Sequence, residues 1–159
     1  MPRHANIVQQ SDVAPLERSH GDKFALKGRS LGMAAGSQKL GCTVYEVPPG
    51  KTAFPSHVHH ANEEAVYILS GAGKMRLGDE QHPVGAGDYI AMPAGGPAHQ
   101  LFNTGATPLV YLCFSTMISP EVVEYPDSKK LGAMVGSRTA PVLRAIYKKD
   151  NQVDYYEGE

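Results

Sequence analysis

A short segment in the first half of the chain holds most of the side chains that could bind a metal ion. Residues 57–64 read HVHHANEE, so three histidines and two glutamates fall within eight residues. Imidazole nitrogens and carboxylate oxygens form a mixed donor set that suits Mn, Fe, Co, Ni, Cu or Zn. The apolar run 65–69 (AVYIL) follows directly, and Gly50 and Gly71 bound the segment. This pattern indicates a metal site built on β-strand structure.

Strand geometry divides these side chains between two faces. Residues two apart in a strand face the same side, so His57 and His59 can chelate one ion while His60 points the other way. A carboxylate from Glu63 or Glu64 can join them after a bend in the chain. At this point either glutamate fits.

A second cluster, residues 95–99 (GGPAH), places His99 at the start of a later strand. Three histidines and one carboxylate would leave two positions of an octahedral ion open to water or substrate. The alternative is that HVHH is a polar surface loop without a metal, and the second cluster argues against it.

The elements that position these residues have the pattern of β-structure. Between residues 40 and 115, Gly, Pro, Asn and Asp signals recur about every 8–12 residues without a helical period, which favours an all-β sandwich or barrel. We expect strands at 23–31, 40–47, 64–69, 74–77, 81–84, 89–92, 99–102 and 109–115.

The whole chain is expected to form a single domain in three parts. Residues 1–22 lack a clear period and are expected to be an N-terminal arm, and residues 23–116 are expected to form the barrel. Residues 117–159 are expected to be a C-terminal extension packed on it. Within this extension, 121–125 fits either a short helix or a strand, and 131–137 (LGAMVGS) is too glycine-rich to assign.

Composition narrows the classes of function. The formal net charge is -1 and no basic stripe is present, which argues against nucleic acid as a partner. No apolar run is long enough to span a membrane. Cys42 and Cys113 fit no CxxC spacing and are expected to be buried free thiols in a reducing compartment. No signal peptide is visible, so we expect a cytoplasmic protein.

The first cluster resembles the first sequence motif of the cupin family. That motif is a glycine, five residues, HxH, three or four residues, a glutamate, six residues and a glycine. Here His57 and His59 are followed by four residues, Glu64, six residues and Gly71. The one departure is that six residues, not five, separate Gly50 from His57.

The second cluster resembles the second cupin motif, which is a glycine, five residues, PxG, two residues, a histidine, three residues and an asparagine. Gly87, Pro93, Gly96, His99 and Asn103 follow this order, with the glycine one place late after the proline. We expect Asn103 to cap a turn rather than to act in catalysis.

The resemblance implies a jelly-roll barrel, the double-stranded β-helix of the cupins, with its ligands on the inner wall. It also implies that His57, His59, Glu64 and His99 hold one divalent transition metal per chain, which could be Zn, Fe, Mn, Ni or Co. The six-residue gap to Gly71 selects Glu64 over Glu63.

Members of the family include dioxygenases, decarboxylases, sugar-phosphate isomerases and epimerases, and modules without catalytic activity. We expect a metal-dependent enzyme of dioxygenase or decarboxylase type that holds a small carboxylate, sugar or aromatic acid in the barrel cavity. A sugar-phosphate isomerase or epimerase, a metal- or ligand-sensing module and a site that has lost its metal are the alternatives. Glu63 and Tyr67 are candidate catalytic residues, and Lys74 and Arg76 are candidate partners for a phosphate.

The two ends of the chain suggest an interaction between copies. The arm and the tyrosine-rich tail, residues 153–159, look too extended to have a core of their own, and small cupins usually pair through such arms. We therefore expect a homodimer.

Overall fold

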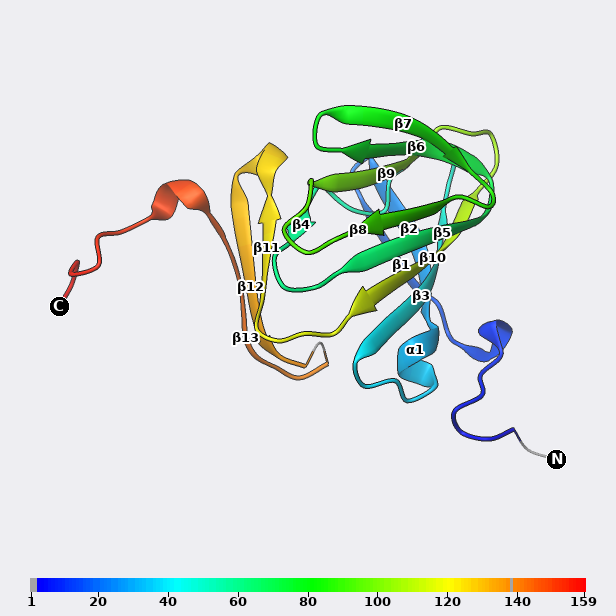
Figure 1. The fold of residues 1–159 in the computed structure, drawn as a ribbon, viewed down its shortest axis with the longest axis horizontal. Coiled ribbons are helices and arrows are strands. Elements are labelled where there is room, and N and C mark those ends of the chain that lie inside the picture. Colours follow the sequence, from blue (N-terminus) through cyan, green and yellow to red (C-terminus); the bar gives the residue numbers. More distant parts are fainter. Residues whose placement is uncertain (1–2, 138) are drawn as a thin grey trace.

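Two antiparallel sheets build the barrel in the computed structural model, which describes residues 3–137 and 139–159 (Figure 1). The larger sheet has the strand order β1-β2-β3-β10-β5-β8, and the smaller has the order β7-β6-β9. Their bounds are β1 Leu16–His20, β2 Phe24–Ser30, β3 Leu40–Val47, β5 Glu64–Ser70, β6 Ala72–Leu77, β7 Glu80–Gly85, β8 Tyr89–Met92, β9 His99–Asn103 and β10 Leu109–Thr116. The predicted all-β jelly-roll barrel is confirmed.

Alternation along the strands separates the core from the surface. In β5, Val66 and Ile68 are buried, whereas Tyr67 and Leu69 expose 39% and 43% of their surface. Leu109 and Tyr111 of β10 pack against the same core. Glu64 shares the inward parity of Val66 and Ile68, so the strand directs its carboxylate into the barrel.

Gly71 shows why the first motif ends in glycine. Its φ of +85° is strained for other residues, and a Cβ atom there would lie 2.6 Å from the carbonyl oxygen of Pro108. A side chain at this position would force β5 and β10 apart.

A third sheet stands beside one end of the barrel, with the strand order β13-β12-β11-β4 (Figure 1). Its strands are β4 Val58–His59, β11 Glu121–Tyr125, β12 Lys130–Gly136 and β13 Pro141–Lys148. The segment 121–125 is therefore a strand, and the glycine-rich segment 131–137 lies largely in β12. Because Val123 of β11 pairs with His59 of β4, this sheet includes a predicted ligand at its edge.

The remaining elements are short. They are η1 Gln10–Asp12, α1 Leu31–Ala34, η2 Pro126–Ser128 and η3 Lys149–Asn151. No helix in the described residues is long and apolar enough to cross a membrane. The expected arm contains β1, which pairs with β2 along its whole length, and residues 1, 2 and 138 lie outside the described part.

Candidate metal centre

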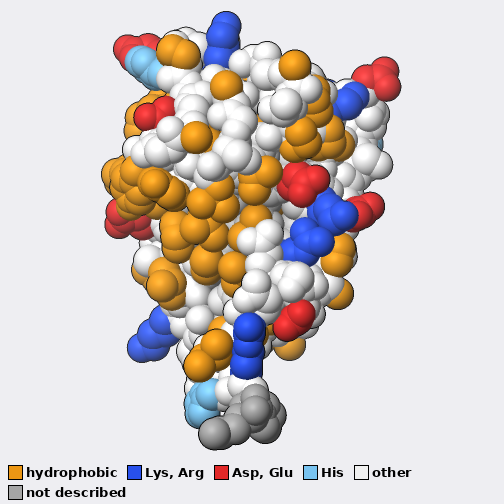
Figure 2. Space-filling model, turned by 90° about the vertical axis from the view of Figure 1, so that its right-hand side faces the viewer, with side chains coloured by type: hydrophobic (Ala, Val, Ile, Leu, Met, Phe, Trp, Pro, Cys, Tyr) orange, Lys and Arg blue, Asp and Glu red, His pale blue; other side chains and the backbone are white. Residues whose placement is uncertain are grey.

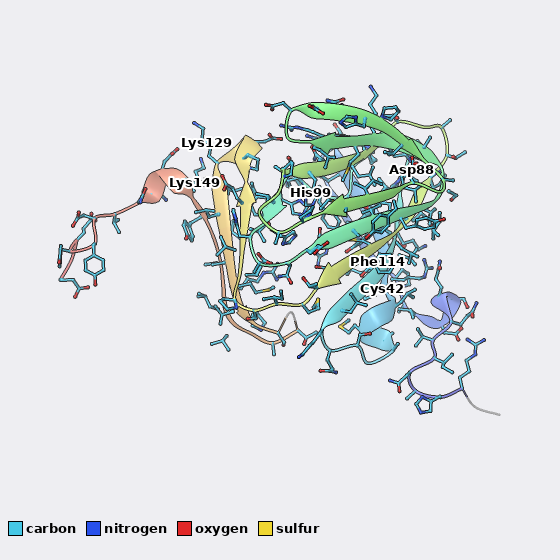
Figure 3. The ribbon with its side chains drawn as sticks, viewed as in Figure 1. Cys42, Asp88, His99, Phe114, Lys129 and Lys149 are labelled. Atoms are coloured by element: carbon cyan, nitrogen blue, oxygen red, sulfur yellow. The ribbon has the colours of Figure 1, made fainter. Side chains whose placement is uncertain are left out.

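A pair of backbone hydrogen bonds brings the two sequence clusters together. The His57 amide donates to the His99 carbonyl at 3.1 Å, and the His99 amide donates to the His57 carbonyl at 2.8 Å. This isolated antiparallel bridge places the two imidazole ring centroids 4.4 Å apart. Figure 3 shows His99 inside the barrel, at the end next to the third sheet.

Glu64 lies between these rings. Its Oε2 is 3.9 Å from the Nε2 atom of His57 and 3.4 Å from that of His99. One ligand atom from each of these three residues lies within 4.8 Å of the others, a spacing that one metal ion could bridge.

His59 completes the arrangement from the other side. Its Nε2 lies 3.5 Å from Oε1 of Glu64, and its ring centroid is 5.0 Å from that of His57. The structure thus gathers all four predicted ligand residues. Of these, His57, Glu64 and His99 lie closest together, and His59 lies beside them. His60 points away and lies 3.5 Å from the carboxylate of Glu124.

Hydrogen bonding favours the ring forms that metal binding requires. The Nδ1 atom of His57 lies 2.9 Å from the Pro55 carbonyl oxygen, which can only accept a hydrogen bond. A proton on Nδ1 leaves the lone pair on Nε2, toward Glu64. Nδ1 of His59 is buried and makes no hydrogen bond of good geometry to a described residue, although Oε2 of Glu121 lies 3.5 Å from it.

Electrostatics give the cluster the right charges. Burial and the neighbouring His99 lower the pKa of His57 to about 4, so this ring is neutral at physiological pH. Burial by itself raises the pKa of Glu64, but interactions with His99, His59 and His57 outweigh it and lower that pKa. A neutral His57 imidazole beside an ionised Glu64 carboxylate suits a divalent ion.

His99 provides a direct test of this fit. Its Nε2 atom is buried and has no hydrogen bond of good geometry to any described residue. A buried polar nitrogen without a partner is costly, and coordination of a metal by this atom would remove that cost. The donor set therefore fits a transition metal.

Glu121 is a buried residue that the sequence did not single out. Its carboxylate accepts hydrogen bonds from the backbone amides of His60, Ala61 and Asn62 at 3.1, 3.2 and 2.9 Å. These bonds fix the turn between β4 and β5, and thereby the positions of the ligands on either side. Its alternation with Val123 and Tyr125 was the only signal in the sequence.

The structure does not bring Glu63 and Tyr67 to the cluster. Glu63 is exposed, and Tyr67 lies on the outer face of β5 beside Tyr89 of β8. Tyr125 of β11 lies beside the cluster instead, and its ring centroid is 6.2 Å from that of His57. Burial raises the pKa of Tyr125, so its hydroxyl stays protonated and can donate a hydrogen bond.

The two basic residues proposed for a phosphate also lie elsewhere. The two terminal guanidinium nitrogens of Arg76 donate hydrogen bonds to the carboxylate of Asp127, at 2.8 and 3.0 Å. Lys74 lines a separate surface hollow with Gly50 and Gln81.

Parts of the chain are similar to known proteins. An uncharacterized protein from Methanocaldococcus jannaschii is 44% identical over 69 residues, which are 43% of this chain and 54% of that protein. The chain thus spans about half the length of this relative.

Two solved structures extend the likeness. A candidate sugar phosphate isomerase from Acidithiobacillus ferrooxidans is 26% identical, with a TM-score of 0.82 over 96% of this chain and 98% of that one. A predicted oxalate decarboxylase from Thermotoga maritima is 27% identical, with a TM-score of 0.62 over 70% of this chain and 99% of that one.

The sequence profile described as "Cupin domain" matches residues 43–115. Residues 43–115 of this chain therefore form a cupin domain.

Proposed function

We propose that the chain is a metal-dependent isomerase that acts on a small phosphorylated sugar. The observation that carries this proposal is the donor cluster itself, three histidines and a carboxylate gathered at the barrel end beside the third sheet. The likeness to the A. ferrooxidans structure supports it, because that match extends over 96% of the chain, including the third sheet.

Different residues of the chain would bind the metal ion and the substrate. His57, His59 and His99 would bind one divalent ion through neutral Nε2 atoms, and Glu64 through a carboxylate oxygen. When bound, such an ion supplies Lewis-acid polarisation of a carbonyl oxygen. Tyr125, with its hydroxyl protonated, would hold a substrate oxygen by hydrogen bonding.

A test of the metal site comes first. Elemental analysis of protein purified without added metal should find about one transition metal per chain. His99→Ala should weaken metal binding by more than about 100-fold, because loss of an outer partner alone costs 10–100-fold. His60→Ala is the matched control and should leave binding unchanged. A metal-free protein that also fails to bind added metal would contradict the proposal.

A test of the reaction follows. The metal-loaded protein is incubated with aldose and ketose phosphates in D2O. We expect interconversion, with deuterium entering next to the carbonyl carbon as seen by NMR. Metal-loaded protein that exchanges no proton in any sugar phosphate would contradict isomerisation and favour a binding module.

Decarboxylation of a small dicarboxylate is a second candidate. The T. maritima structure described as a predicted oxalate decarboxylase favours it, since this chain covers 99% of that one. Release of CO2 from oxalate by the metal-loaded protein would support this candidate against the isomerase.

A further inference from the structure

The third sheet has two faces of different charge. Directly opposed residues of an antiparallel pair share a face. On the face away from the metal centre, the carboxylate of Glu124 pairs with the ammonium of Lys149 and lies 3.5 Å from His60. The positive charges of that face are therefore matched by a carboxylate.

The opposite face carries a different set. Tyr125 of β11 pairs with Lys130 of β12, which pairs with Lys148 of β13. Glu121 of β11 likewise pairs with Met134 of β12, which pairs with Arg144 of β13. Since Tyr125 contacts His57 and Glu121 contacts His59, this face looks toward the metal centre.

Tyr125 connects these cations to the metal centre. Its ring lies over the gap left by Gly132, where an added Cβ atom would be 3.6 Å from the ring edge. The Nζ atom of Lys130 lies 5.3 Å from the centre of the same ring. The charge of Arg144 partly opposes the rise that burial causes in the pKa of Tyr125, which indicates that the two groups are close.

The cations on this face lack acidic partners. Lys130, Arg144 and Lys148 form no ion pair within the described residues. The acidic residue of their own face, Glu121, is buried and bound by backbone amides. At the opposite end of the molecule, one group of Lys and Arg side chains lies directly beside Asp and Glu side chains (Figure 2). Unmatched cations beside a metal site are suited to bind an anionic group.

We propose that Lys130, Arg144 and the hydroxyl of Tyr125 bind the phosphate group of the substrate while its sugar end faces the four metal ligands. This inference rests on the proposed function and names the residues that would select a phosphorylated substrate. Lys148, at the end of the same row, adds positive charge at its rim. The recognised chemistry is a phosphate dianion, which either a phosphate ester or free inorganic phosphate presents.

The test uses the full chain without metal at about pH 8, where histidines are neutral. Inorganic phosphate, glycerol phosphate and glycerol are titrated by calorimetry. We expect both phosphates to bind and glycerol not to bind. Arg144→Ala and Lys130→Ala should each weaken phosphate binding about tenfold, as expected for loss of a charge-assisted hydrogen bond. Arg144→Lys should restore part of the loss.

Lys149→Ala is the matched control, because it removes a lysine charge that pairs with Glu124 on the other face of the same sheet. It should change phosphate binding less than twofold. Equal losses in Lys149→Ala and Arg144→Ala, unchanged binding in Arg144→Ala and Lys130→Ala, or no phosphate binding would each overturn the subsite. Metal binding is measured on the same variants. If the wild-type protein binds no phosphate but binds metal at the expected stoichiometry, this inference alone is contradicted. If it binds phosphate but cannot bind added metal, the proposed metal-dependent reaction is contradicted instead.

If glycerol phosphate binds more tightly than inorganic phosphate, the subsite recognises a substrate ester. If inorganic phosphate binds more tightly and metal-loaded protein converts no ester, the subsite serves free phosphate and the substrate assignment is wrong.

Discussion

At the scale of single residues, His57 shows how the chain prepares a side chain that could bind a metal ion. Its Nδ1 faces the Pro55 carbonyl, and burial beside His99 keeps the ring neutral. The same features make His57 a source of pH-dependent stability. An unfolded histidine takes up a proton at its ordinary pKa of 6.5, whereas His57 in the folded chain does so at about 4.

The first prediction follows from that difference. As pH falls from 6.5 to about 4, the unfolded chain binds a proton at His57 that the folded chain does not. The metal-free protein should therefore lose up to about 3 kcal/mol of unfolding free energy through this residue. The lowered pKa of Glu64 acts in the same direction at lower pH.

Urea denaturation of metal-free protein over this pH range measures the effect. His57→Gln should lose less unfolding free energy than the wild type between pH 6.5 and 4. Parallel pH profiles for the two proteins would show that His57 does not have a lowered pKa.

The residues that the structure gathers could be predicted from sequence, but their surroundings could not. Strand parity placed His57 and His59 on one face, and the cupin motif's six-residue gap to Gly71 selected Glu64, because these patterns are local in the sequence. Glu121 and Tyr125 reach the centre through the pairing of β11 with β4, which links residues more than 60 positions apart and leaves no local pattern.

At the scale of elements, β11 connects the extension to the metal centre through Glu121. Replacement by Gln keeps the shape but removes the charge that faces three backbone amides and His59. Glu121→Gln should weaken metal binding 10–100-fold, the usual cost of losing a partner of a ligand. Glu124→Gln, on the opposite face of β11, should leave it unchanged. Equal metal affinities for both variants would show that Glu121 does not position His59.

Asn103 lies at the end of β9 opposite to His99, where its side chain makes hydrogen bonds to the backbone of neighbouring segments. Its side chain donates to the carbonyls of Val47 and Thr107, both at 2.8 Å, and accepts from the Gly105 amide at 2.9 Å. The residue is 1% exposed. It therefore holds a turn, as expected from its place after a strand.

Asn103→Ala leaves these buried groups without partners and should cost about 2–4 kcal/mol of unfolding free energy. Thr104→Ala, at the exposed neighbour, should cost less than about 0.5 kcal/mol. Denaturant titration compares the two. A stable Asn103→Ala protein that fails only in metal or substrate binding would contradict a structural role.

Apart from β1, which lies in the expected N-terminal arm, the barrel strands could be predicted because turn residues separate them regularly. Strand β12 could not, since its glycines have low strand propensity and its stability comes from partners on both edges. Pairing with neighbouring strands, rather than local propensity, decides whether such a segment forms a strand.

At the scale of the whole molecule, the outer edge of the third sheet is incomplete. Within the described residues, β13 pairs only with β12, and on the face opposite Arg144 and Lys148 the side chains of Leu143 and Tyr147 each expose 49% of their surface. The chain beyond η3 leads away from the barrel (Figure 1), with Tyr155 and Tyr156 exposed by 87% and 75%. An open strand edge beside exposed apolar groups favours association.

We propose that a second copy of the chain covers β13 and the tail. Sedimentation analysis should find a dimer, and removal of residues 152–159 should weaken it because the two tyrosines contribute apolar contact area. The double variant Tyr155→Ser with Tyr156→Ser should reproduce most of the loss. Tyr89→Ser, which replaces an exposed tyrosine of β8 in the barrel, should not weaken the dimer. A truncated chain that dimerises as tightly as the full chain would leave β13 as the contact and remove the tail from it. A full chain that stays monomeric at every concentration would contradict both, and would place the subsite cations of β13 at a free edge.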